Sequence, residues 1–297
     1  MISIPRTLFS IGSRNAFSLN VGLKARPVKL FSPTSLLQLR GYRPPPRFHQ
    51  FQPRNLRHRF NNIRWGELVY PALFTGAFCA ITPYILPYIV DSIPALKRNP
   101  SLVTIPIIGI NVGIFFAHRL PRLLPLLRKY FLLVNARPFS VWSMLGSGFS
   151  HQSFTHLFFN MFCFQSFAPA LCGVLGPSTF LLVYLGSIVC SSFASLAFRT
   201  ISLSLVILSL GASGGIFGIL GVFSYLFPNA GVALFFIPVP GGAWMLFLAS
   251  FAFNVAGLFY RGPFDFAAHI GGSVAGIYYG WRANEERKKR RRRRIVF

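Results

Sequence analysis

The sequence predicts an all-α polytopic membrane protein in which one separate apolar helix precedes a compact group of six. Hydrophobic residues make up 53% of the 297-residue chain and the mean hydropathy is +0.53, which is too apolar for an ordinary soluble domain. Seven apolar segments follow residue 66, and about 20 apolar residues suffice for a helix to span a bilayer. No internal repeat is evident, which argues against an inverted-repeat transporter.

The charged residues gather at the two ends of the chain. Twelve of the 30 Lys and Arg residues precede residue 65, and nine lie between residues 282 and 294. Such polarised charge also occurs in nucleic-acid-binding proteins. Because the middle of the chain is so apolar, basic flanks on a membrane protein are the simpler interpretation, and we expect no nucleic-acid partner.

The N-terminal segment, residues 1–66, resembles a targeting sequence. It has no Asp or Glu, and its Arg and Lys residues are spaced among Ser, Leu and Phe. This composition is typical of a mitochondrial presequence, and the segment lacks the continuous apolar core of a secretory signal. A disordered basic tail is the alternative. We expect a presequence followed by a disordered basic linker, and a multi-pass protein of the mitochondrial inner membrane.

The predicted helices follow in order. Val69–Val90 is an extra N-terminal transmembrane helix, within a region 67–91, and its three prolines should bend it. The core occupies residues 100–281, and between its first two spans residues 118–150 are amphipathic and expected at the membrane interface. Residues 282–297 form a basic tail that we expect to be solvated and to touch anionic lipid. The six core spans are Leu102–Ala117, Phe154–Leu171, Thr179–Phe198, Leu205–Phe227, Ala243–Tyr260 and the short, glycine-rich Phe264–Trp281.

Small residues recur every four positions in two of these spans. In lipid, this spacing lets two helix backbones approach closely. We therefore expect the two spans to pack together and to bring Ser213 and His269 within hydrogen-bonding reach. The small residues are Ala268, Gly272, Gly276 and Gly280 in the last span, and the pairs Gly211 with Gly215 and Gly214 with Gly218 in the other.

Polar side chains inside the six-helix group fall into three clusters. The first is His151, His156 and Asn160, the second is Ser213 among its glycines, and the third is Asp265 with His269. Such groups are unfavourable in a bilayer unless they are paired or face water, so they are functional candidates by default. Generic helix packing explains the glycines but not these neighbours.

The clusters supply the parts that acyl transfer needs. A serine hydroxyl is a weak nucleophile until an imidazole accepts its proton, and Ser213 and His269 suit these two roles. His156, Asn160 and the backbone N–H of Ser213 are candidate donors to the negative oxygen that develops. Asp265 is interpreted as a helix-capping carboxylate, with an orienting role toward His269 as the alternative. We expect a serine–histidine dyad.

Cofactor and metal sites are not indicated by the sequence. The four cysteines, at positions 79, 163, 172 and 190, form no CxxC motif and lie in apolar segments, so we interpret them as buried small hydrophobes. A metal site built on the histidines lacks a third ligand at suitable spacing. We expect neither metal nor cofactor.

Three motifs together resemble the rhomboid family of intramembrane serine proteases. They are HxxxxHxxxN (His151, His156, Asn160), GASG (residues 211–214) and AHIGGSVAG (residues 267–276), in the family's order on separate spans. The flanking sequences, and the extra helix before a six-helix core, are most similar to fungal mitochondrial inner-membrane members. The resemblance covers roughly residues 100–281.

The resemblance implies specific roles. Ser213 would be the nucleophile, His269 the base, and His156 and Asn160 the oxyanion donors, with Gly211, Gly214, Phe217 and His151 shaping the site. Phe217 stands where an aromatic residue, frequently Tyr, packs on the histidine. Single-span membrane proteins would be the substrates, and mitochondrial relatives suggest a dynamin-like GTPase and cytochrome c peroxidase. Many bacterial members carry Trp-Arg in the first loop, whereas Ser143 follows Trp142 here, so the geometry of that loop is not carried over.

Two other classes of protein remain as alternatives. A non-catalytic relative that escorts membrane clients would lack the nucleophile or the base, and both are present. A channel lined by the polar clusters would need a continuous polar path through both leaflets, and the clusters lie toward one side. The sequence gives no indication of the oligomeric state.

Overall fold

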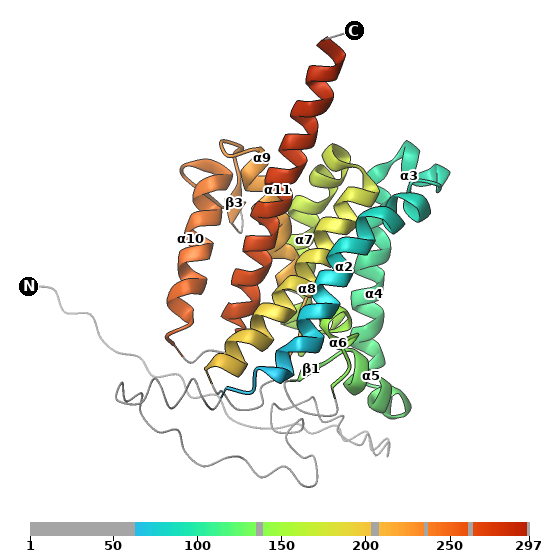
Figure 1. The fold of residues 1–297 in the computed structure, drawn as a ribbon, viewed down its shortest axis with the longest axis vertical. Helices are drawn as coiled ribbons and strands as arrows, with labels where there is room; N and C mark the ends of the chain where they lie inside the picture. Colours follow the sequence, from blue (N-terminus) through green and yellow to red (C-terminus); the bar gives the residue numbers. More distant parts are fainter. Residues whose placement is uncertain (1–62, 135–138, 203–207, 235–236, 261–263, 296–297) are drawn as a thin grey trace, which may run out of the picture. The chain divides into compact units, whose positions relative to one another are not determined.

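The computed structural model describes residues 63–134, 139–202, 208–234, 237–260 and 264–295, which belong to one of the chain's two units, residues 51–297 (Figure 1). The predicted presequence and linker, residues 1–66, lie outside the described residues apart from residues 63–66. The longer helices are α2 (Gly66–Val90), α4 (Thr104–Ala117), α7 (Phe154–Leu175), α8 (Pro177–Ile201), α9 (Ser213–Leu226), α10 (Gly242–Gly257) and α11 (Phe266–Ile295).

The polytopic all-α fold is confirmed. Within the described part of the chain, four helices are long and apolar enough to cross a membrane: α2, α4 together with the preceding turn η3 (Pro100–Val103), α7 and α8. Helices α9 and α10 are apolar but shorter. Helices α2 and α11 begin at the same end of the bundle, where α8 and α10 end (Figure 1).

Helix α2 continues through all three of its prolines and packs against α8. Its threonines give their hydroxyl hydrogens to backbone carbonyls of the preceding turn, Thr75 to Pro71 and Thr82 to Phe78. At its far end, Ser178 Oγ donates to Asp91 Oδ2 over 3.0 Å, which links the end of α2 to the start of α8. The extra helix is therefore attached to the core by packing and by a polar contact.

Short elements connect the long helices. The stretch expected at the interface contains η4 (Pro121–Leu123), α5 (Leu124–Tyr130), α6 (Ser143–Gly146) and η5 (Ser147–Phe149), and α3 (Pro94–Arg98) follows α2. Strand β1 (Leu133–Val134) pairs antiparallel with β2 (Leu208–Ser209), with Leu133 opposite Ser209. A second hairpin joins β3 (Ala233–Leu234) to β4 (Ile237–Pro238).

The start predicted for the span Leu205–Phe227 is wrong. Helix α9 begins only at Ser213, because residues 208–209 pair with β1 and Gly211 adopts φ of +134°. A backbone of this kind favours glycine and cannot continue a right-handed helix. The consequence is functional, since Ser213 becomes the first residue of a helix instead of lying within one.

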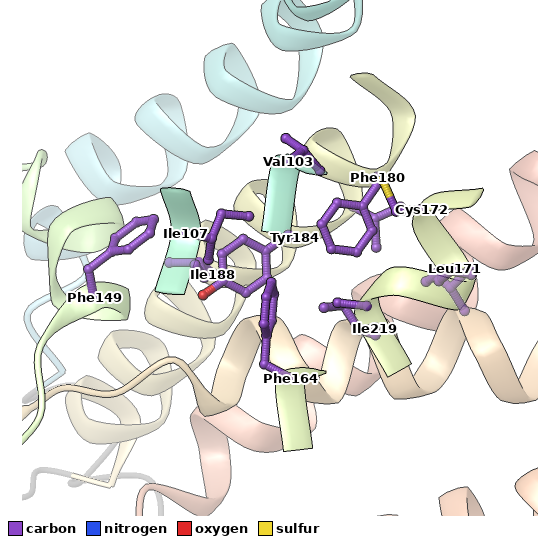
Figure 2. Packing of buried hydrophobic residues seen from close by; sticks show 13 residues of the cluster. Val103, Ile107, Phe149, Phe164, Leu171, Cys172, Phe180, Tyr184, Ile188 and Ile219 are labelled. Carbon is purple, nitrogen blue, oxygen red and sulfur yellow. The ribbon is translucent and has the colours of Figure 1, made fainter. Parts of the chain in front are cut away.

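A hydrophobic core lies between α7, α8 and α9 (Figure 2). Tyr184 is at its centre, and its ring packs edge-on against those of Phe149 and Phe164. Cys172 lies fully buried in the same cluster, as predicted, whereas Cys79, Cys163 and Cys190 are only half-buried. Cys79 of α2 and Cys190 of α8 face each other, with 3.9 Å between their sulfur atoms.

The basic tail continues α11 as a helix through Ile295, beyond the rest of the bundle (Figure 1). Its two glutamates are each paired with a lysine three residues later, Glu285 with Lys288 and Glu286 with Lys289. The hydrogen bond from Lys288 lowers the pKa of Glu285 below its ordinary value. These pairs leave the arginine run that follows strongly positive.

Candidate active site

Ser213 and His269 are hydrogen-bonded to each other. The distance from Ser213 Oγ to His269 Nε2 is 2.8 Å. Ser213 is the first residue of α9, and His269 lies one turn into α11. Both side chains are half-buried.

The close approach of α9 and α11 depends on glycine. A Cβ atom on Gly276 would lie 2.8 Å from Gly218 Cα, and one on Gly221 would lie 3.1 Å from Gly276 Cα. A Cβ on Gly272 would likewise lie 2.9 Å from the backbone carbon of Gly214. The two helices thus touch backbone to backbone, as the spacing of Gly214 and Gly218 predicts, and this contact sets the short distance between Ser213 and His269. The pair Gly211 with Gly215 is wrong as part of this face, because Gly211 lies against His156 and Gly215 against side chains of α8.

Two further side chains hold the imidazole of His269. Asn254 of α10 lies with its Oδ1 2.7 Å from His269 Nδ1 and is 1% exposed. Phe217 of α9 stacks on the ring, with 4.5 Å between centroids and 32° between planes. The ring is therefore contacted at both nitrogens and on one face.

Asp265 does not contact the imidazole in the described hydrogen bonds; it caps α11. Its Oδ1 accepts from the Ala268 N–H at 3.1 Å. Its Oδ2 pairs with the buried guanidinium of Arg199 at 2.7 Å and accepts from Ser195, both on α8. The capping interpretation agrees with this geometry, and the carboxylate also joins the start of α11 to the end of α8.

A cavity of about 60 Å³ adjoins the pair. Ser213, His269, His156, Gly211 and Gly214 all line it, together with the hydroxyl-bearing residues Ser147, Ser191, Ser192 and Ser209. This volume is sufficient for a few water molecules, and the serines offer polar partners for them.

The remaining predicted site residues lie on or beside α7. A Cβ on Gly211 would come within 2.9 Å of His156 Nε2, so the lack of a side chain at this glycine makes room for the His156 ring. His151 is buried, and its ring packs edge-on against that of His156 at 4.9 Å between centroids. Asn160, one turn further along, donates from Nδ2 to the His156 carbonyl at 2.8 Å and is not among the residues lining the cavity.

Sequence reasoning missed Asn254 and Arg199. Each is a strongly polar residue within an apolar span, a signal that by itself marks a functional or paired side chain. Asn254 was overlooked because it belongs to none of the glycine or histidine motifs, and Arg199 because its partner Asp265 is 66 residues away.

A Rhomboid domain matches residues 138–285. Over 274 residues the chain is 40% identical to Rhomboid protein 1, mitochondrial, of Saccharomyces cerevisiae, covering 87% of this chain and 77% of that protein. The chain belongs to the rhomboid family. Human presenilin-associated rhomboid-like protein, mitochondrial, is 34% identical over 175 residues, which are 58% of this chain and 46% of that protein. A putative rhomboid protease of Bacillus subtilis, YdcA, is 40% identical over 85 residues, or 29% of this chain and 41% of that protein.

Membership confirms the resemblance seen in the three motifs. The predicted mitochondrial, multi-pass membrane localisation is confirmed by the mitochondrial relatives and by the apolar helices. Rhomboids are in general intramembrane proteases that act on membrane proteins within the bilayer, and this chain is a member of that family.

Proposed function

We propose that this rhomboid is an active intramembrane serine endopeptidase of the mitochondrial inner membrane, with Ser213 as nucleophile and His269 as general base. The observation that carries the proposal is the 2.8 Å contact between Ser213 Oγ and His269 Nε2 beside a polar cavity. Nucleophilic catalysis requires a serine within hydrogen-bond reach of a base, and a third group that holds this base in place.

The first half of the reaction forms an acyl-enzyme. Ser213 Oγ attacks the scissile carbonyl carbon while its proton passes to His269 Nε2, and the carbonyl oxygen becomes an oxyanion. His156 and the Ser213 N–H, which lie at the cavity, are the proposed donors to that oxyanion; the N–H groups of a first helical turn have no partner within the helix. Asn160 does not line the cavity, so its proposed part as a donor requires its side chain to turn from the His156 carbonyl toward the oxyanion. Breaking of the C–N bond then releases the amine, which takes the proton from His269.

The second half uses water. A water molecule from the adjoining cavity gives a proton to His269 and attacks the acyl carbon, and the same proton returns to Ser213 Oγ as the acid leaves. The serine-lined cavity supports this step because it lies against both residues of the dyad. No metal or cofactor is required by this sequence of steps.

The substrates that we propose are single-span membrane proteins, with a dynamin-like GTPase and cytochrome c peroxidase as the candidates implied by the family. The protease core would be residues 100–281, preceded by the extra helix. The dyad lies near the start of α11, at the end of the bundle where α2 also starts (Figure 1). A presequence directs the N-terminus into the matrix, and with the N-terminus there we propose that the site opens toward the matrix side.

The test compares wild type with Ser213→Ala and His269→Ala. Purified full-length proteins in liposomes are given a single-span substrate labelled on both sides of its helix, with and without EDTA. We expect cleavage by wild type only. Equal cleavage by the variants would contradict the dyad, loss of wild-type cleavage in EDTA would favour a metal site, and binding without cleavage by all three would favour a client-escort function.

A further inference from the structure

Asn254 is a buried amide of the peripheral helix α10, and both ends of its side chain are hydrogen-bonded. Its Nδ2 donates to the Ser250 carbonyl, one turn back on the same helix, over 2.8 Å. Its Oδ1 faces His269 Nδ1 at 2.7 Å. We propose that Asn254 is a positioning residue that fixes the tautomer and orientation of His269, so that the site is a Ser213–His269–Asn254 triad. This inference rests on the proposed protease function.

The bond to Ser250 decides which way the amide points. A backbone carbonyl only accepts hydrogen bonds, so the group of Asn254 that faces it must be the NH₂. The carbonyl oxygen of the amide is then the group that faces His269. The reverse orientation would place two acceptor oxygens against each other in a buried site.

The amide oxygen in turn decides where the imidazole carries its proton. Because Asn254 Oδ1 only accepts, His269 Nδ1 must donate, and a neutral imidazole has one N–H. Nε2 therefore presents its lone pair to Ser213 Oγ, 2.8 Å away, which is the state a general base needs. A ring with its proton on Nε2 instead would be unable to accept the serine's proton.

Asn254 also suits the charged state of the reaction. When His269 takes the serine proton it becomes an imidazolium. Asn254 Oδ1 then accepts a hydrogen bond from His269 Nδ1–H, and Asn254 itself is only 1% exposed. A neutral amide provides this acceptor without burying a permanent charge in the bilayer. The one carboxylate near the ring among the described residues, Asp265, is already paired with Arg199. A Cys–His–Asn triad uses asparagine in the same manner.

The contact depends on how closely α10 packs against α11. A Cβ atom on Gly257 would meet the ring of Phe266, the first residue of α11, at less than van der Waals distance. Gly257 lies three residues after Asn254, on the same face of α10. At the other end of α10, Ser224 Oγ of α9 donates to the Ala243 carbonyl over 2.9 Å. These contacts hold α10 where Asn254 reaches the imidazole.

The experiment uses Asn254→Leu, which has a similar shape and no acceptor, and Asn254→Asp, which keeps an acceptor oxygen. Asn111→Leu is the matched control, because Asn111 is another buried helix asparagine, and its Nδ2 donates to the Ile107 carbonyl over 2.7 Å. For each protein in liposomes we measure kcat, KM, the rate at which a fluorophosphonate labels Ser213, and Tm.

We expect Asn254→Leu to lower kcat and the labelling rate about 10- to 100-fold with KM nearly unchanged, by analogy with the loss when the partner that orients a metal-bound histidine is removed. Asn254→Asp should recover part of both rates. Asn111→Leu should lower Tm without this effect on either rate. A wild-type kcat in Asn254→Leu, or an equal fall of kcat in Asn111→Leu, would overturn the inference.

A second measurement needs no variant at position 254. Nitrogen-15 chemical shifts of labelled histidine distinguish the two tautomers, and the signals missing from His269→Ala identify His269. We expect its proton on Nδ1 in wild type. A proton on Nε2 would overturn the inference even if cleavage is intact. A proton on Nδ1 in a protein that cleaves no substrate would support Asn254 as the positioning group and contradict the proposed protease function.

Discussion

Helices α9 and α10 each provide hydrogen-bonding partners or packing for His269, but they are held in the bundle in different ways. Helix α9 packs against α7, α8, α10 and α11, and most of its residues from Gly214 to Val222 are buried. Helix α10 packs mainly against α11 and α9, and large apolar side chains such as Met245 and Phe253 are exposed on it. The nucleophile thus comes from the interior of the bundle and the proposed positioning amide from its edge.

This difference separates two requirements of the site. The distance from Ser213 to His269 is set by a backbone contact between α9 and α11, which adjusts little because packed interiors resist deformation. The contact from Asn254 to His269 is set by a helix that has fewer neighbours. Perturbing the first contact should therefore affect folding and activity together, and perturbing the second should affect mainly the rate of the chemical step.

The largest effect is expected from Gly276→Leu in the contact between α9 and α11. A side chain here would collide with the backbone of Gly218, which cannot rotate away, so we expect loss of activity and a Tm lowered by many degrees. Gly109→Leu is the control, because among the described residues no atom beyond its own helix turn lies within 4 Å of a Cβ at that position of α4. Measured activity and Tm near wild type for Gly276→Leu would mean that the close backbone contact is not needed.

A smaller and more selective effect is expected from Gly257→Leu on α10. The leucine side chain would push against the Phe266 ring and move α10 away from α11, so that Asn254 loses its hydrogen bond to the imidazole of His269. We expect kcat to fall about tenfold, by analogy with removal of the partner that orients a metal-bound histidine, while Tm falls by only a few degrees. The control is Gly173→Leu on α7, where no neighbouring helix in the described part of the chain comes within 4 Å of a Cβ. If instead Tm falls as far as in Gly276→Leu, the distinction between the two helices is wrong.

The same difference explains what could be predicted from the sequence. The contact between α9 and α11 follows from glycines at four-residue spacing, a local pattern that needs no knowledge of the fold, so Ser213 and His269 were expected to meet. The contact of Asn254 with His269 depends on where α10 lies, and one amide in an apolar helix does not indicate its partner. The apolar pattern extends the helix back through residues 208–212, whereas residues 208 and 209 pair with β1, 74 to 76 residues earlier, which is a tertiary contact.

The smallest effect is expected at Phe217, through which α9 also restrains the imidazole. Its ring stacks on that of His269, and aromatic contacts of this kind contribute about 0.5–1.5 kcal/mol. Because Asn254 and Ser213 still hold both ring nitrogens, we expect Phe217→Leu to lower kcat only about 2- to 10-fold, whereas Phe217→Tyr, which keeps the ring, should be close to wild type. Combining Phe217→Leu with Asn254→Leu tests whether the two restraints act on the same ring. If they do, the fold-loss of kcat in the double variant should differ from the product of the two single fold-losses. A double loss equal to that product would mean that the two side chains act independently.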